Sequence, residues 1–187
     1  MENANQQYRS DRHSDINLEP SPFLVENLNL LPKGKALDVA MGSGRNSVFL
    51  AQNGFEVEGI DISLDAVRET QALATKKGVV IGVSVVDLER GYKLKREFYD
   101  VIICFHYLQR SLIPQMKDAL KPEGVVVYET FIIDQATLFG KPRNPDFLLK
   151  HNELLDMFHD FRCLRYREGV IDNRAAIASI VALKKLV

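Results

Sequence analysis

Short apolar runs alternate with helix-like segments along most of this chain. The runs are rich in aliphatic and β-branched residues, and "DVIIC" is apolar throughout, which is typical of strands covered on both faces. The predicted strands are 35–40, 56–60, 79–86, 99–104 and 125–131. The predicted helices between them are 45–53, 63–77 and 111–120, with Ser63 as an N-cap and Gly78 as a stop. This alternation predicts an α/β fold with a parallel sheet and helices on both faces.

The two ends of the chain depart from this alternation of strands and helices. Ser21-Pro22 reads as an N-cap and first helical residue, so a helix is expected from there to about Leu31. Near the other end, a helix over 151–161 precedes two strand-like runs, 162–170 and 176–186. Only "IDNRA" separates these runs, which is too short for a crossover helix. They are therefore expected to pair antiparallel and to close the sheet as a hairpin.

Composition limits the class of protein. The 187 residues are 46% hydrophobic, which suits one domain with a substantial core, preceded by a polar lead-in over residues 1–20. The 24 basic and 25 acidic residues nearly cancel, so neither nucleic acid nor an anionic membrane is an expected partner. No apolar run reaches the roughly 20 residues of a membrane span.

Location and metal content are also constrained by the sequence. The first 20 residues lack the apolar core of a secretory signal. Cys104 and Cys163 lie far apart and outside any metal-ligand spacing, so a cytoplasmic protein with free thiols is expected. The histidines are scattered, and no metal site is expected. The pattern does not indicate an oligomeric state.

A glycine turn, "AMGSGRNS", follows the first strand and opens the first crossover helix. In open α/β sheets this is where ligands bind, because strand order reverses there. A dinucleotide fingerprint would need glycine where Ser47 stands, and an S-adenosylmethionine turn would have glycine where Ala40 stands. The glycines alone leave both interpretations open.

Three acids around this turn favour S-adenosylmethionine. Asp38 lies inside the first strand, where a carboxylate would repel a pyrophosphate but attract an amino group. Asp61 ends the second strand and is placed to accept hydrogen bonds from both ribose hydroxyls. Asp87 follows the third strand and is placed to accept a hydrogen bond from an adenine amino group. The C-terminal hairpin is also unlike an ordinary dinucleotide-binding domain.

These motifs resemble the class I S-adenosylmethionine-dependent methyltransferases over residues 22–187. The matching segments are "LDVAMGSGRNS", "GIDIS", "VVDLE", "FYDVIICF" and "LKPEGVVVYET". "GRNSVFLAQNGFEVEGIDIS" is most similar to the small tellurite-resistance methyltransferases. The resemblance implies a Rossmann-like, central seven-stranded, mostly parallel sheet with an antiparallel C-terminal strand. Ala40 and Glu123 depart from the glycines usual in that pattern.

The resemblance also implies a cofactor site. S-adenosylmethionine would be bound and S-adenosylhomocysteine released. The residues that it assigns to the cofactor are Asp38, Ala40, Met41, Gly42, Gly44, Arg45, Asn46, Asp61, Ile62, Asp87, Leu88, Cys104 and Phe105. Ala40 would slightly narrow the room beside the methionine end of the cofactor.

Several other residues are candidates for binding or activating the group that accepts the methyl. His106 and Glu129 follow or end strands at the same edge, and each is either a general base or a structural residue. Tyr107 and Tyr8 offer aromatic faces to a cationic sulfur, and Tyr8 lies in a segment that is either a lid or disordered. Arg143, in the turn-rich segment 139–147, would bind an anionic substrate unless it is simply solvated.

The function expected from these features is methylation of a small molecule, such as a thiol or a metalloid oxyanion. A soft anionic nucleophile would need no general base, whereas an alcohol or amine would. A non-catalytic protein that binds S-adenosylmethionine and, less favoured, an NAD-dependent oxidoreductase are the alternatives.

Overall fold

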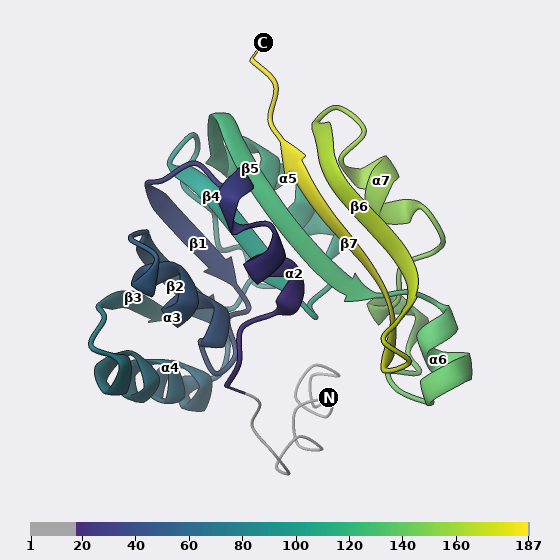
Figure 1. The fold of residues 1–187 in the computed structure, drawn as a ribbon, viewed down its shortest axis with the longest axis horizontal. Coiled ribbons are helices and arrows are strands. Elements are labelled where there is room, and N and C mark those ends of the chain that lie inside the picture. The colour runs from purple at the N-terminus through teal and green to yellow at the C-terminus, as the bar shows by residue number, and fades with distance from the viewer. Residues whose placement is uncertain (1–17, 187) are drawn as a thin grey trace.

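A seven-stranded sheet forms the centre of the molecule (Figure 1), described here by a computed structural model that covers residues 18–186. Its strand order is β3-β2-β1-β4-β5-β7-β6. The strands are β1 (Lys35–Val39), β2 (Glu56–Asp61), β3 (Ile81–Val85), β4 (Tyr99–Phe105), β5 (Leu120–Phe131), β6 (Arg162–Ile171) and β7 (Ala175–Leu183). The first five run parallel to one another, while β7 runs antiparallel to both β5 and β6.

Helices cover both faces of this sheet. They are α2 (Pro22–Glu26), α3 (Arg45–Gln52), α4 (Leu64–Lys77), α5 (Ile113–Ala119), α6 (Asp134–Phe139) and α7 (Glu153–Met157), with 3₁₀ turns η1 (Leu28–Leu30), η2 (Arg110–Leu112) and η3 (Pro145–Phe147). In Figure 1, α2 lies in front of the sheet and α5 behind it. The predicted class of fold, an α/β sheet closed by an antiparallel hairpin, is therefore confirmed.

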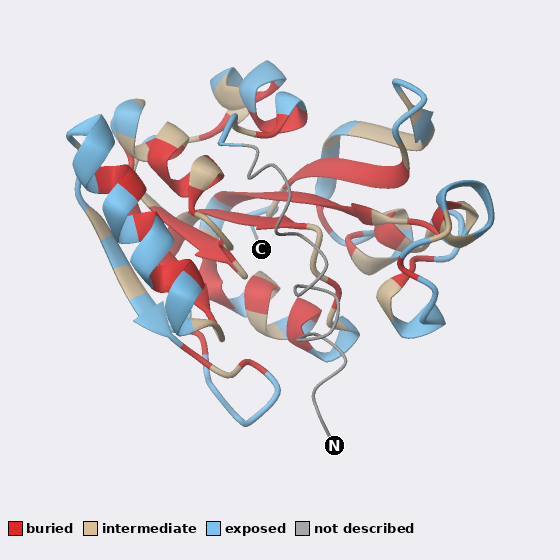
Figure 2. Cartoon of the chain, turned by 90° about the horizontal axis from the view of Figure 1, so that it is seen from below, coloured by how far each residue is buried: buried red, intermediate tan, exposed pale blue. Residues whose placement is uncertain are grey.

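The core consists of two apolar layers, one on each side of the strands. Phe23 and Leu24 of α2 and Leu50 of α3 pack on one face, and α5 and α7 pack on the other. The central strands β1, β4, β5 and β7 are largely buried, whereas the helices expose their outer sides (Figure 2). Of the part of the chain that the structure describes, no helix has the length and apolar character that a membrane span requires.

Helix α4 begins and ends where the sequence predicts. The Ser63 hydroxyl accepts a hydrogen bond from the Ala66 amide (3.3 Å), as an N-cap does. Gly78 ends the helix with a left-handed backbone (φ 68°), which costs glycine little because it has no side chain. The orientation of α4 matters for the site because Thr70, on its buried side, contacts the glycine turn.

Several predicted boundaries were wrong. The first helix stops at Glu26 and continues only as η1, and Ser21 does not cap it with its side chain. Of the predicted helix 151–161, only α7 is helical, because Asn152 has a left-handed backbone (φ 61°) and turns follow Met157. Strand β3 ends at Val85, so Asp87 lies two residues beyond it.

Two further elements differ from the prediction. Strand β5 already begins at Leu120, and Glu123 in its "KPEG" segment has a positive φ (63°) in place of the usual glycine. Helix α6 was not predicted, because its six residues are too few to show a helical period. It shortens the expected loop that leads to η3, and η3 lies beside the candidate site.

Candidate active site

The candidate site lies at the carboxyl ends of the central strands. Strand order reverses between β1 and β4, because the chain first builds β2 and β3 on one side and then β4 and β5 on the other. Ligands of open α/β sheets bind at this point. The turn after β1 and the residues after β2, β4 and β5 therefore meet along one edge.

The glycine turn after β1 leaves its backbone uncovered. Gly42 and Gly44 both have left-handed backbones (φ 57° and 75°). A side chain at Gly44 would collide with Thr70, so this glycine is required by packing against α4. Among residues 18–186, no atom lies within 4 Å of where a side chain at Gly42 would begin. Gly42 thus faces open space, where a ligand can approach the backbone closely.

Ala40 has the same backbone conformation without being glycine. Its φ is 54°, a region that costs an L-residue energy because Cβ approaches the following carbonyl. From the sequence, only a narrower space beside the cofactor is expected at Ala40. The structure adds backbone strain at the residue where the related motif has its first glycine.

Met41, the next residue of the turn, lies inside the protein. Its side chain is buried and occupies space that Gly59 of β2 leaves open. Its amide donates a hydrogen bond to the Ile60 carbonyl (3.1 Å), which fixes the turn to the second strand. Met41 therefore fixes the turn to β2 through its amide and through its buried side chain, while contact of its backbone with the cofactor stays a prediction.

Asp61 connects the glycine turn to the start of α4. Its carboxylate is 1% exposed and accepts hydrogen bonds from the amides of Gly42 (3.0 Å) and Ser63 (2.8 Å). Each carboxylate oxygen can accept more than one hydrogen bond, so these contacts are compatible with ribose hydroxyls as additional donors. Ile62, the next residue, is half-buried at the same edge.

Asp38 is the acid inside β1. It is 2% exposed, and the Ser47 hydroxyl of α3 donates a hydrogen bond to it (2.6 Å). Burial raises the pKa of Asp38 to about 7, although the Ser47 hydrogen bond opposes this shift. A cationic amino group close to Asp38 would favour its ionised form. This is the complementarity expected for the methionine end of S-adenosylmethionine.

Asp87 and Leu88 follow β3 in a turn. The Asp87 carboxylate accepts a hydrogen bond from the Glu89 amide (2.9 Å) and lies 3.3 Å from the Arg90 guanidinium. The Leu88 side chain is buried, and its carbonyl accepts a hydrogen bond from the Gln109 side chain (3.2 Å). This turn is therefore held by the segment after β4.

Arg45 and Asn46 contact the chain that leads into α2. The Asn46 side-chain oxygen accepts a hydrogen bond from the Ser21 amide (2.8 Å), and the Arg45 guanidinium donates one to the Glu19 carbonyl (3.0 Å). Both residues begin α3 at the site edge, as predicted. Their described contacts hold residues 19–21 against the glycine turn.

Cys104 and Phe105, at the end of β4, point to opposite faces of the sheet. Cys104 is fully buried, and its thiol donates to the Tyr107 carbonyl (3.7 Å). Burial raises the thiol pKa well above its ordinary value, which fits a packing residue rather than a nucleophile. Phe105 packs with the α2 and α3 layer.

His106 lies where β4 leaves the sheet. Its backbone is left-handed (φ 56°), and its amide donates a hydrogen bond to the Glu129 carbonyl (2.8 Å). The imidazole stacks on the Phe131 ring, with centroids 5.0 Å apart and planes 27° apart. His106 and Phe131 thus form a pair of stacked rings at the carboxyl ends of β4 and β5.

Glu129 is buried in a polar network on the other side of β5. Its carboxylate accepts hydrogen bonds from Ser179 (2.7 Å), Ser21 (3.4 Å) and the Arg167 guanidinium (3.3 Å). These partners come from β7, from the start of α2 and from β6. The contacts are those of a structural residue, which was one of the two predicted roles.

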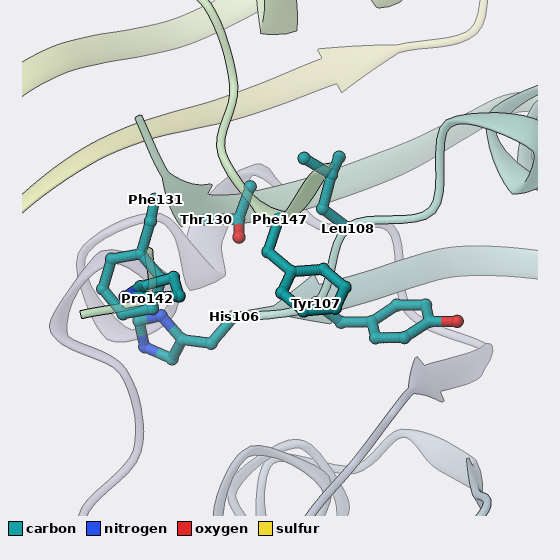
Figure 3. A pocket seen from close by; sticks show the side chains of 7 residues that line it. All are labelled: His106, Tyr107, Leu108, Thr130, Phe131, Pro142 and Phe147. Carbon is teal, nitrogen blue, oxygen red and sulfur yellow. The ribbon is translucent and has the colours of Figure 1, made fainter. Parts of the chain in front are cut away.

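A pocket opens beside His106 (Figure 3). Its described lining consists of His106, Tyr107, Leu108, Thr130, Phe131, Pro142 and Phe147. The rings of His106 and Phe131 lie together on one side, and the hydroxyl end of Tyr107 points away from them, because it donates a hydrogen bond to Gln109 (2.7 Å). Sequence reasoning found only His106 and Tyr107. Phe131 could have been found as an aromatic residue ending β5 at the same edge.

The other acceptor candidates lie elsewhere. Arg143 is exposed, and its guanidinium donates to the Gly140 carbonyl (3.0 Å) outside the pocket lining. Tyr8, and with it the hypothesis of a lid, lies outside the described residues. Residues 18–186 contain no group of histidine, cysteine and acidic side chains able to hold a metal ion.

The strand order, the glycine turn, the acid inside β1 and the acid that ends β2 are features of the class I S-adenosylmethionine-dependent methyltransferase fold. More narrowly, the sequence model described as "Tellurite resistance protein TehB" matches residues 5–178, so the chain belongs to the TehB family. This membership implies S-adenosylmethionine as the cofactor.

Individual relatives agree with this assignment. A protein of Haemophilus influenzae named "Probable S-adenosyl-L-methionine-dependent methyltransferase TehB" is 24% identical over 79% of this chain and 52% of its own length. The "Ubiquinone biosynthesis O-methyltransferase" of Histophilus somni is 30% identical over 58% of this chain and 49% of its own length. The chain thus spans about half the length of these curated relatives.

A solved structure shows the same fold. The crystal structure of TehB from Haemophilus influenzae superimposes with a TM-score of 0.72, covering 87% of this chain and 62% of that one. The two sequences are 22% identical there, so the likeness speaks for the fold.

Proposed function

We propose that this chain transfers the methyl group of S-adenosylmethionine to a small-molecule acceptor. The observation that carries the proposal is the turn at Gly42, whose backbone the described residues leave uncovered while its amide donates a hydrogen bond to the buried Asp61. In this proposal, the turn binds the ribose and the methionine part of the cofactor, and the two acids Asp61 and Asp38 lie on either side of it. When bound, the cofactor supplies an electrophilic methyl group on a sulfonium.

The residues of the chain contribute binding and orientation. Asp61 is placed for the ribose hydroxyls, Asp38 for the amino group and the Gly42 backbone for close approach of the ligand. Methyl transfer from a sulfonium has a good neutral leaving group, so alignment and exclusion of water account for much of the required catalysis. His106 and Phe131 provide the wall against which an acceptor would be aligned.

We propose a cellular compartment and a substrate class from the composition of the chain. The described cysteines, Cys104 and Cys163, are both unpaired, which favours a reducing compartment such as the cytoplasm. The near-balance of charge favours a small molecule over nucleic acid as the substrate.

Calorimetry tests the cofactor site. S-adenosylmethionine and S-adenosylhomocysteine should bind the protein, whereas NAD should not. Asp61→Asn should weaken S-adenosylhomocysteine binding by roughly 10- to 100-fold, because a neutral amide replaces a charged acceptor. Asp65→Asn is the matched control, since Asp65 is exposed in the first turn of α4 and should leave affinity unchanged. Binding of NAD alone would instead identify an oxidoreductase.

Turnover separates an enzyme from a binding protein. Release of S-adenosylhomocysteine should rise when small thiols, metalloid oxyanions or phenols are supplied with S-adenosylmethionine. Tight cofactor binding with no acceptor-dependent release over a broad panel would favour the non-catalytic alternative.

A further inference from the structure

We propose that the pocket beside His106 binds the methyl acceptor and selects a small thiol over an oxyanion. This inference rests on the proposed methyl transfer, and it names the substrate class of the same site. Two features of the pocket support it: the chemistry of the side chains that line it and the contacts that hold Phe147 in place.

The walls offer an oxyanion little. None of the described lining residues is a lysine or arginine, and most are aromatic or aliphatic. Their polar side-chain groups are the His106 imidazole, the Thr130 hydroxyl and the Tyr107 phenol, which is directed to Gln109. An anion such as tellurite would lose hydration here without gaining a charged partner. A thiol sulfur, by contrast, is polarisable and packs favourably against aromatic rings.

Two arginines of the surrounding segments have structural partners. Arg143, next to Pro142, donates to the Gly140 carbonyl. Arg167 contacts the carboxylates of Glu129 (3.3 Å) and Glu26 (3.6 Å) on the far side of β5. Neither guanidinium belongs to the lining. Neither of these two guanidinium groups is therefore directed to an anionic acceptor in the described part of this pocket.

Arg110 positions the wall that Phe147 provides. Its guanidinium donates to the carbonyls of Asp146 and Leu148 (2.9 Å each), the residues on either side of Phe147. It also forms an ion pair with Glu153 (2.6 Å). The segment after β4 thus holds η3 in place, so that Phe147 lies opposite the His106 and Phe131 pair. Arg110 is a positioning residue for the pocket.

The reaction at this pocket balances without a further reactant. The thiol proton passes to the His106 imidazole or to water as the thiol sulfur forms a bond to the methyl carbon. The bond between that carbon and the sulfonium breaks, and its electron pair remains on the sulfonium sulfur. The products are a methyl thioether and a neutral thioether, with one proton released.

The experiment compares acceptors. S-adenosylhomocysteine release is measured with S-adenosylmethionine and either 1-propanethiol, selenite or tellurite. We expect kcat/KM for the thiol to exceed that for each oxyanion at least tenfold. Binding of 1-propanethiol to the protein saturated with S-adenosylhomocysteine is measured by calorimetry as an independent readout.

Matched variants locate the effect. Phe147→Leu removes part of the wall and should raise the KM for 1-propanethiol at least threefold, with unchanged affinity for S-adenosylhomocysteine. Phe139→Leu is the control, because Phe139 belongs to α6 and is partly exposed outside the lining. It should change neither value.

The outcomes separate the two proposals. A preference for selenite or tellurite, or neither binding nor turnover of the thiol in a protein that binds S-adenosylhomocysteine, would overturn the acceptor assignment alone. Equal effects of the Phe147 and Phe139 substitutions would do the same. Absence of S-adenosylmethionine and S-adenosylhomocysteine binding would instead remove the proposed function.

Discussion

At the scale of single residues, Ala40 carries a backbone strain that a glycine would relieve. Its left-handed φ of 54° costs an L-residue roughly 1–2 kcal/mol. Glycine avoids this cost but loses about 0.5–1 kcal/mol more conformational entropy than alanine when the chain folds, which offsets part of the gain. Ala40→Gly should therefore raise the free energy of unfolding by about 0.5–1 kcal/mol, measured by urea denaturation. Ala51→Gly, inside α3, is the opposite control and should lower it by about 1 kcal/mol. Destabilisation by both changes would show that Ala40 is not strained.

Asp38 should make stability depend on pH. Its folded-state pKa of about 7 lies above the ordinary 3.8, so the folded protein binds an extra proton between these values. By linkage, this residue lowers stability as pH rises from about 4 to 7, by up to about 4 kcal/mol in total. Asp38→Asn abolishes that titration. The stability of the variant relative to the original chain should therefore increase between pH 4 and 8, as followed by denaturant unfolding. A difference that is constant with pH would contradict the shift.

The acids themselves could be read from the sequence, but their partners could not. Asp38 and Asp61 stand at strand positions that any alternation of strands and helices would bring to one edge. The Ser47 hydroxyl, which approaches Asp38, and the Gly42 amide, which approaches Asp61, depend on the exact path of the turn. The left-handed conformation of Ala40 could not be predicted for the same reason, because alanine, unlike glycine, does not indicate a left-handed backbone.

At the scale of elements, long segments followed their patterns and short ones did not. Helix α4 shows its cap, its buried side and its glycine stop in sequence. Helices α6 and α7 and the turn η3 are three to six residues long, and tertiary contacts decide their limits. The pocket wall at Phe147 belongs to this second group, which is why sequence reasoning missed it.

Removal of the Arg110 guanidinium should loosen that wall. Arg110→Met loses the two carbonyl contacts around Phe147 and the ion pair with Glu153. We expect the KM of the acceptor to rise severalfold, kcat to change less and cofactor affinity to stay constant, measured by steady-state kinetics and calorimetry. Arg68→Met is the control, because its contact with Asp65 is exposed and long (3.7 Å). A purely structural Arg110 would lower stability and leave KM unchanged.

At the scale of the whole molecule, the sheet was predictable and its cross-connections were not. Alternating runs and the short "IDNRA" link predicted the parallel strands and the closing hairpin. The network around Glu129 joins Ser21, Arg167 and Ser179, and the first of these lies 108 residues away in sequence. No local pattern reports contacts of such separation. This is why a buried acid at the end of β5 left two roles open.

The placement of β7 has a consequence for the order in which the molecule is assembled during translation. Strand β6 leaves the ribosome before β7, yet β7 lies between β6 and β5. Until β7 is synthesised, β6 has no neighbour in the sheet and β5 presents an open edge. The nascent chain must therefore keep this edge from pairing with other chains. Insertion of one buried strand, which is mostly alanine, isoleucine and valine, completes both pairings together.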